Sequence, residues 1–141
     1  MTASRDRERL ALQICVALGG CVPVGAGLAG IVLGPWLASG VILVPIPLDS
    51  HFRYLSGLLL AIGLAFWSTV PQIAHAGPRY RLLSGLVFVG GLGRLVSLLT
   101  LGAPDAPMLF GLAMELLVTP ALAFWQARVA WPLAARPARS I

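Results

Sequence analysis

Residues 82–101 read LLSGLVFVGGLGRLVSLLTL, and residues 107–131 read PMLFGLAMELLVTPALAFWQARVAW. A transmembrane helix needs about 20 apolar residues at a rise of 1.5 Å each, and both stretches reach that length. The five residues between them, GAPDA at 102–106, are typical of a tight turn, and Pro107 suits the first position of a helix. These stretches therefore predict a hairpin of two membrane-spanning helices, the second kinked near Pro120.

Two further apolar runs precede this hairpin. We expect Asp49 and Ser50 to cap the second of them. The predicted domain covers residues 10–131, between a charged start at 1–9 and a tail at 132–141. Its four spans are placed at about 10–34, 52–73, 82–101 and 107–131. The segment 35–51 is apolar but too short to span, so we expect it at the membrane interface or as a buried connecting loop.

The composition agrees with this architecture. The chain has 141 residues, of which 58% are hydrophobic and 11% charged, and its mean hydropathy is +0.90. A soluble domain of this size could not cover so apolar a chain with polar groups. The net charge of +5 comes from arginines in short clusters between apolar runs, a distribution that argues against nucleic-acid binding. The sequence therefore predicts an all-α membrane protein, a bundle of four transmembrane helices.

The arginines predict the orientation. With the N-terminus in the cytoplasm, only Arg53 falls in an external loop. Eight others fall on the cytoplasmic side: Arg5, Arg7, Arg9, Arg79, Arg81, Arg128, Arg136 and Arg139. Because positive residues gather on the cytoplasmic side of membrane proteins, we expect both termini in the cytoplasm. The expected location is a bacterial inner membrane, which the chain crosses several times.

Two charged residues lie deep in the predicted bilayer, Arg94 in the third span and Glu115 in the fourth. Each is about ten residues from the intervening turn, so an antiparallel hairpin places both roughly 10–12 Å below the helix ends. A lone charge at such a depth is costly, whereas two opposite charges can neutralise each other. We therefore predict an Arg94–Glu115 ion pair.

Small and polar residues surround this pair in the sequence. Gly90, Gly91 and Ser97 lie within a turn of Arg94, and Gly111 and Thr119 flank Glu115. Such neighbours favour close helix approach and leave room for a polar group. The pair has two interpretations, a site for a ligand head group or a proton path, and a structural contact that fixes helix register. Arg53 either pairs locally with Asp49 or extends the polar site.

No catalytic or metal-binding set is found in the sequence. His51 and His75 fall on opposite sides of the membrane, and no cysteine or carboxylate cluster joins either. We therefore predict no enzyme activity, no cofactor and no metal. A ridge of small residues at Ala26, Gly30 and Gly34 favours helix packing in the bundle or with another chain.

Three motifs resemble those of a known family. They are FRYLSG at 52–57, GGLGRLVS at 90–97 and MELLVTP at 114–120. Over about residues 10–131 the chain resembles an uncharacterised bacterial family of four-helix membrane proteins, domain of unknown function 4345. The resemblance implies four spans and points to Arg53, Arg94 and Glu115, but it implies no activity, cofactor or partner.

Three functional hypotheses remain open at this stage. The first is a non-catalytic accessory or scaffolding subunit of a larger membrane complex. The second is a binder or carrier of a lipid or small amphiphile that uses Arg94 and Glu115. The third, a membrane enzyme, would have to work with Arg94, Glu115, Ser97 and Thr119 alone. The expected partners are membrane lipids and either a larger membrane-protein complex or further copies of the chain.

Overall fold

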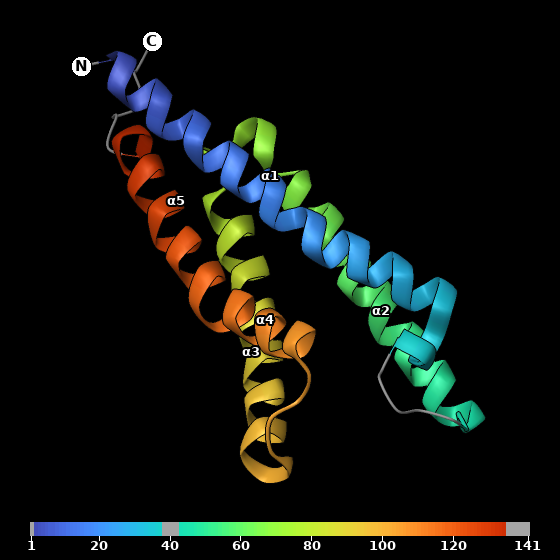
Figure 1. The fold of residues 1–141 in the computed structure, drawn as a ribbon. Coiled ribbons are helices and arrows are strands. Elements are labelled where there is room, and N and C mark those ends of the chain that lie inside the picture. The colour runs from blue at the N-terminus through green and yellow to red at the C-terminus, as the bar shows by residue number, and fades with distance from the viewer. Residues whose placement is uncertain (1, 38–42, 135–141) are drawn as a thin grey trace. The chain divides into compact units, whose positions relative to one another are not determined.

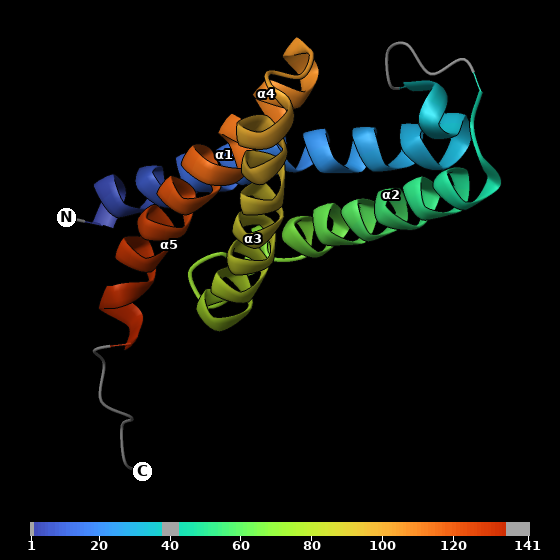
Figure 2. The ribbon, with the colours of Figure 1, turned by 90° about the horizontal axis from the view of Figure 1, so that it is seen from below.

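The computed structural model describes residues 2–37 and 43–134, and every regular element in these ranges is a helix. The α-helices are α1 (Thr2–Leu33), α2 (Ile46–Trp67), α3 (Gly77–Leu101), α4 (Ala106–Ala113) and α5 (Thr119–Ala134) (Figure 1, Figure 2). Short 3₁₀ turns lie at Gly34–Leu37 and Val70–Gln72, and a π-helical turn at Met114–Val118 joins α4 to α5. Residues 38–42 of the expected interfacial segment and residues 135–141 of the expected tail, with Arg136 and Arg139, lie outside the described residues.

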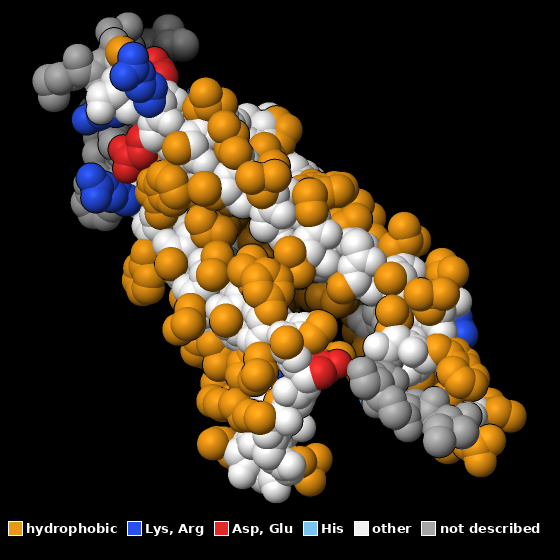
Figure 3. All heavy atoms as spheres, in the orientation of Figure 1, with side chains coloured by type: hydrophobic (Ala, Val, Ile, Leu, Met, Phe, Trp, Pro, Cys, Tyr) orange, Lys and Arg blue, Asp and Glu red, His pale blue; other side chains and the backbone are white. Residues whose placement is uncertain are grey.

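Four helical stretches are long and apolar enough to cross a membrane, namely Ala3–Leu37, Ile46–Gln72, Gly77–Leu101 and Ala106–Ala130. The prediction of an all-α membrane protein with four spans is confirmed. Large apolar side chains remain exposed on all of them, and Figure 3 shows such side chains over most of the visible face. This surface is stable in a bilayer, because lipid tails are as apolar as the side chains that contact them.

The start of α2 differs from the expectation. The helix begins at Ile46, with Pro45 as its N-cap residue and Pro47 in its first turn. Proline suits this place because its φ is already helical and its missing N–H would have no helical partner there. The prediction that Asp49 and Ser50 cap the helix is therefore wrong, since both lie inside its first turns.

The chain divides into two compact units, and each has its own core. Residues 15–68 form the α1–α2 unit, which contains most of α1 and all of α2. Residues 1–14 and 69–141 form the α3–α5 unit, which also contains the first turns of α1.

In the α1–α2 unit, glycines of α1 bring the two helices into contact. A Cβ on Gly27 would lie 2.6 Å from the Leu60 nitrogen and 2.8 Å from the Ser56 carbonyl oxygen, so no larger residue fits. Gly30 lies on the same face, against Ser56. The predicted ridge is wrong at Ala26, which is exposed. Ala26 lies about 100° around the helix from Gly27, which takes it off the contact face.

The core of the α3–α5 unit lies around the segment between α2 and α3. Ile73 and Gln126 are fully buried there. Two glutamine side chains hold the backbone of this segment, because the Gln13 amide donates to the Val70 carbonyl and the Gln126 amide donates to the Ile73 carbonyl, both at 2.7 Å. Buried carbonyl groups need such partners, so these side chains allow a non-helical segment to be packed inside.

The two ends of the described chain meet in the same unit. Because α1 begins at Thr2, the charged start at 1–9 continues the helix. Glu8 accepts a hydrogen bond from the Trp125 indole at 3.3 Å and lies 3.5 Å from the Arg128 guanidinium. The start of α1 and the end of α5 therefore lie at the same end of the α3–α5 unit, as an even number of spans requires.

Candidate functional site

The candidate site lies where α3 meets the segment that joins α4 to α5. Gly91 is buried on α3, and a Cβ there would lie 2.7 Å from Leu116 Cδ2 and 2.9 Å from Glu115 Cβ. The absence of a side chain at Gly91 therefore allows the two helices to approach closely. Arg94 follows three residues later, so it lies on nearly the same face of α3 and turns toward the same segment.

A π-helical turn presents Glu115. The Thr119 backbone N–H donates to the Met114 carbonyl, five residues earlier, and the Thr119 hydroxyl donates to the same oxygen at 2.8 Å. Pro120 has no N–H, so it cannot make the α-helical bond to the Leu116 carbonyl. The break expected near Pro120 is thus a π turn that ends just before it, and such turns are frequent at functional sites.

The structure brings Arg94 and Glu115 into contact. Arg94 Nε donates to Glu115 Oε1 at 3.1 Å, and Arg94 Nη1 donates to the Met108 sulfur at 3.0 Å. The Glu115 side chain is 16% exposed and the Arg94 side chain 39%. Glu115 Oε2 is buried and has no hydrogen-bond partner among the described residues. The site therefore has one exposed cationic face and one carboxylate oxygen that can still accept a hydrogen bond.

The other residues predicted around the pair divide into two groups. Gly111 lies beside it, because a Cβ there would be 3.9 Å from Arg94 Cζ. The Thr119 hydroxyl is used by the π turn. Gly90 and Ser97 are exposed, and a Cβ on Gly90 would meet no atom within 4 Å. These two residues line an open face of α3 instead of the pair.

Met108 is the contact that the sequence reasoning missed. It lies seven residues before Glu115, a spacing that puts two residues on the same helix face. This spacing was a usable signal, but a thioether is only a weak hydrogen-bond acceptor and a search for charged partners passes over it.

Arg53 has a different set of contacts, all within the α1–α2 unit. Its Nε donates to Asp49 Oδ2 at 2.8 Å and its Nη2 to Asp49 Oδ1 at 3.1 Å. Its Nη1 donates to the carbonyls of Ile31 and Val32, at the end of α1. A cation in this position satisfies carbonyl groups that the helix end leaves without partners. Arg53 thus joins the start of α2 to the end of α1.

Gly34 makes the Arg53 contacts possible. Its φ of 63° ends α1 in the left-handed region, and a Cβ there would lie 2.7 Å from Arg53 Nη2 and 2.8 Å from Asp49 Oδ1. A residue with a side chain would strain the backbone and displace the guanidinium. Gly34, predicted as a packing residue, therefore also forms the turn that receives Arg53.

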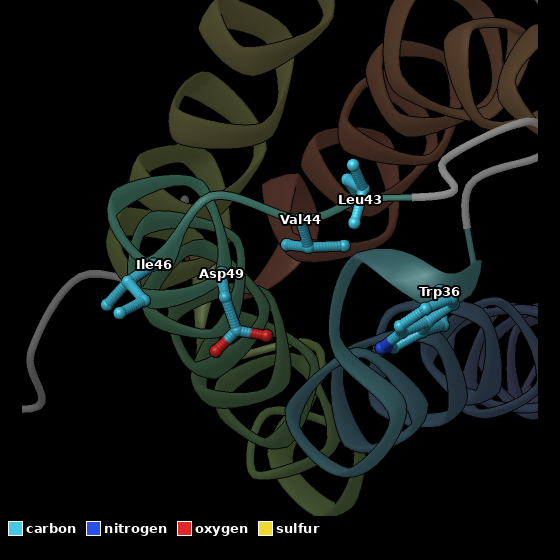
Figure 4. Close-up of a pocket in the computed structure, with 5 residues that line it drawn as sticks. All are labelled: Trp36, Leu43, Val44, Ile46 and Asp49. Atoms are coloured by element: carbon cyan, nitrogen blue, oxygen red, sulfur yellow. The ribbon is translucent and has the colours of Figure 1, made fainter.

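A hollow beside this cluster is mostly apolar. Figure 4 shows its lining, formed by Trp36, Leu43, Val44, Ile46 and Asp49. Asp49 is the only charged residue of the lining, and both of its carboxylate oxygens already accept from Arg53. The hollow therefore has no free charged group to orient a ligand.

No group of three His, Cys, Asp or Glu residues that could hold a metal ion is found in the part of the chain that the structure describes. Comparison with curated proteins and with solved structures gives no match. The family model described as domain of unknown function (DUF4345) matches residues 11–126, which include the Arg94–Glu115 pair and the Arg53 cluster. The chain therefore belongs to the DUF4345 family.

Proposed function

We propose that this protein binds a small amphiphile through the Arg94–Glu115 pair. The observation that carries the proposal is the incomplete hydrogen bonding of the pair, since Glu115 Oε2 is buried without a partner. A purely structural ion pair within a span is stable only when its remaining lone pairs and protons are satisfied as well. An acceptor that is left open at the centre of an ion pair favours a ligand.

The chemistry of the pair limits the kind of head group. The Arg94 guanidinium, partly exposed, suits a carboxylate, phosphate or carbonyl oxygen. Glu115 Oε2 suits a hydroxyl or amine donor. The nearest atom to a Cβ on Gly111 would be Arg94 Cζ at 3.9 Å, so there is space beside the guanidinium. A ligand with an acceptor and a donor on adjacent atoms, and an apolar tail toward the lipid, fits this description.

The test compares variants of the pair in mild detergent, with native mass spectrometry of the purified protein as the measurement. Arg94→Leu alone leaves a carboxylate in an apolar surrounding, and removing one partner of a buried pair can cost about 3–5 kcal/mol. Arg94→Leu with Glu115→Leu removes both charges and is expected to fold better than the single variant. We expect the wild type to retain a small molecule that the folded double variant has lost.

A matched control lies on the same helix. Leu99→Ala removes an exposed apolar side chain without touching the pair and is expected to retain the molecule. A wild type that carries no small molecule above the level of the double variant would contradict the proposal. A folded double variant without any loss would instead assign the pair a structural role.

A second function, an accessory subunit of a larger membrane complex, is favoured by the open face of α3. Gly90, Gly93 and Ser97 form a stripe of exposed small residues, and a Cβ on either glycine would meet no atom within 4 Å. Small residues allow a helix of a partner protein to pack closely in a membrane. Gly93→Leu should then release a stoichiometric partner protein during purification and leave the retained amphiphile unchanged. Purification without any such partner would exclude this second function.

A further inference from the structure

Three buried side-chain oxygen atoms in the described part of the chain have no hydrogen-bond partner: Ser84 Oγ, Glu115 Oε2 and Gln126 Oε1. All three lie along the contact between α3 and the α4–α5 segment. Gly91 of α3 contacts Glu115, and the nearest atoms to a Cβ on Gly77 of α3 belong to Gln126 and Arg81. Ser84 lies seven residues from each glycine, which places it on the same face of α3, midway between them.

The orientation of the Gln126 amide is fixed by its surroundings. Its Nε2 donates to the Ile73 carbonyl at 2.7 Å, so the opposite assignment would place two acceptors against each other. Gln126 Oε1 is therefore an acceptor that faces away from this bond, inside a residue with no exposed surface. Buried oxygen atoms in this state are usually satisfied by ordered water.

There is space for water at this end of the contact. A Cβ on Gly77 would lie 3.8 Å from Gln126 Nε2, 3.9 Å from Gln126 Oε1 and 3.9 Å from Arg81 Nη1. Each of these nearest atoms is polar and none is close enough to clash. A small polar space thus lies beside Gly77, and an ordered water needs only a few such partners.

We propose that a file of ordered water follows the α3 face from Glu115 past Ser84 to Gln126 and Arg81. The steps from Gly91 to Ser84 and from Ser84 to Gly77 are each about 10 Å along the helix axis. Water molecules about 2.8 Å apart cover such a step in a short chain. The file connects Glu115 with the aqueous phase at the end of the unit that carries Glu8 and Arg128. It requires no amphiphile at Arg94, so it goes beyond the function proposed above.

The first experiment measures water access at Ser84 by cysteine labelling in proteoliposomes. Cys15 and Cys21 are replaced by alanine, Ser84→Cys is introduced, and 2-aminoethyl methanethiosulfonate is the reagent. Only the thiolate reacts, and hydrocarbon disfavours it, so we expect labelling at least about tenfold faster than at the control. The control is Leu86→Cys, at nearly the same depth on α3 but among the exposed apolar side chains. Equal, slow labelling at both positions in folded protein would overturn the proposal.

The second experiment uses the unmodified chain, so it decides the question even when Ser84→Cys fails to fold. Water-edited solid-state NMR measures how fast magnetisation passes from water to the Ser84 and Gln126 side chains in liposomes. We expect both to be reached as quickly as exposed residues at the ends of the helices. Transfer to Gln126 without transfer to Ser84 would overturn the continuous file, and transfer to neither would overturn it entirely. Loss of amphiphile binding would leave both readouts unchanged.

Discussion

Replacing Gly91 with alanine tests the close helix contact that places Arg94 beside Glu115. The added Cβ would lie 2.7 Å from Leu116 Cδ2 and 2.9 Å from Glu115 Cβ. Carbon atoms in favourable contact are about 3.5–4.0 Å apart, so a shift of several tenths of an ångström or more is required. The Leu116 methyl group can rotate away, but Glu115 Cβ moves only with its backbone. The substitution must therefore separate the two helices.

The expected effect follows from two opposing terms. Forcing an extra carbon into a packed contact costs roughly 1–3 kcal/mol. Alanine also favours the helical state over glycine by about 1 kcal/mol, which partly offsets this cost. Gly90→Ala isolates the first term, because Gly90 has the same helical gain and no atom within 4 Å of the added Cβ. The difference in unfolding free energy between the two variants should therefore be about 1–3 kcal/mol.

The assay is unfolding of the purified protein in mixed micelles with a rising fraction of dodecyl sulfate, followed by tryptophan fluorescence. Gly91→Ala should unfold at a lower dodecyl sulfate fraction than Gly90→Ala and should retain less of any bound amphiphile. Equal midpoints for the two variants would refute the close contact at Gly91, and with it the geometry assigned to the ion pair.

Two further predictions concern the ends of the spans. Gly34→Ala places a side chain at a φ of 63°, which costs about 1–2 kcal/mol, so it should lower the midpoint in the same titration. Gly25→Ala, which meets no atom within 4 Å, should not, and equal midpoints would exclude the left-handed turn. In the cell, reporter fusions after Gly77 and at Ile141 should both report cytoplasm, and a fusion at Asp105 should report the outside. Opposite signals at Gly77 and Ile141 would remove the predicted orientation.

The spans were predictable because length and apolarity alone decide what can cross a bilayer. The helix starts were not, because a helix does not end where the lipid ends. The charged residues after Thr2 continue α1, and two prolines let α2 begin at Ile46. Hydropathy marks the part of a helix that contacts lipid, whereas its first residue depends on capping and on backbone geometry.

The packing face of α1 was predicted less well than its existence. Gly30 lies against α2, but Gly27 and not Ala26 is its neighbour on the contact face. Glycine and alanine are equally small, so composition does not distinguish one small face from another. The choice depends on which side of α1 the second helix occupies, a property of the pair of helices that neither sequence run contains alone.

The Arg94–Glu115 pair stands at the other extreme, because charge is costly in hydrocarbon and therefore rare enough to be informative. Equal distances from one turn were sufficient to place the two residues together. Counting charges, however, assigns each residue a single partner, whereas a carboxylate has two oxygens and a guanidinium has three nitrogens. Met108 takes one guanidinium nitrogen, and Glu115 Oε2 is left over. A neutral pair can thus be incomplete in its hydrogen bonds, and that remainder favours a ligand or water over a purely structural role.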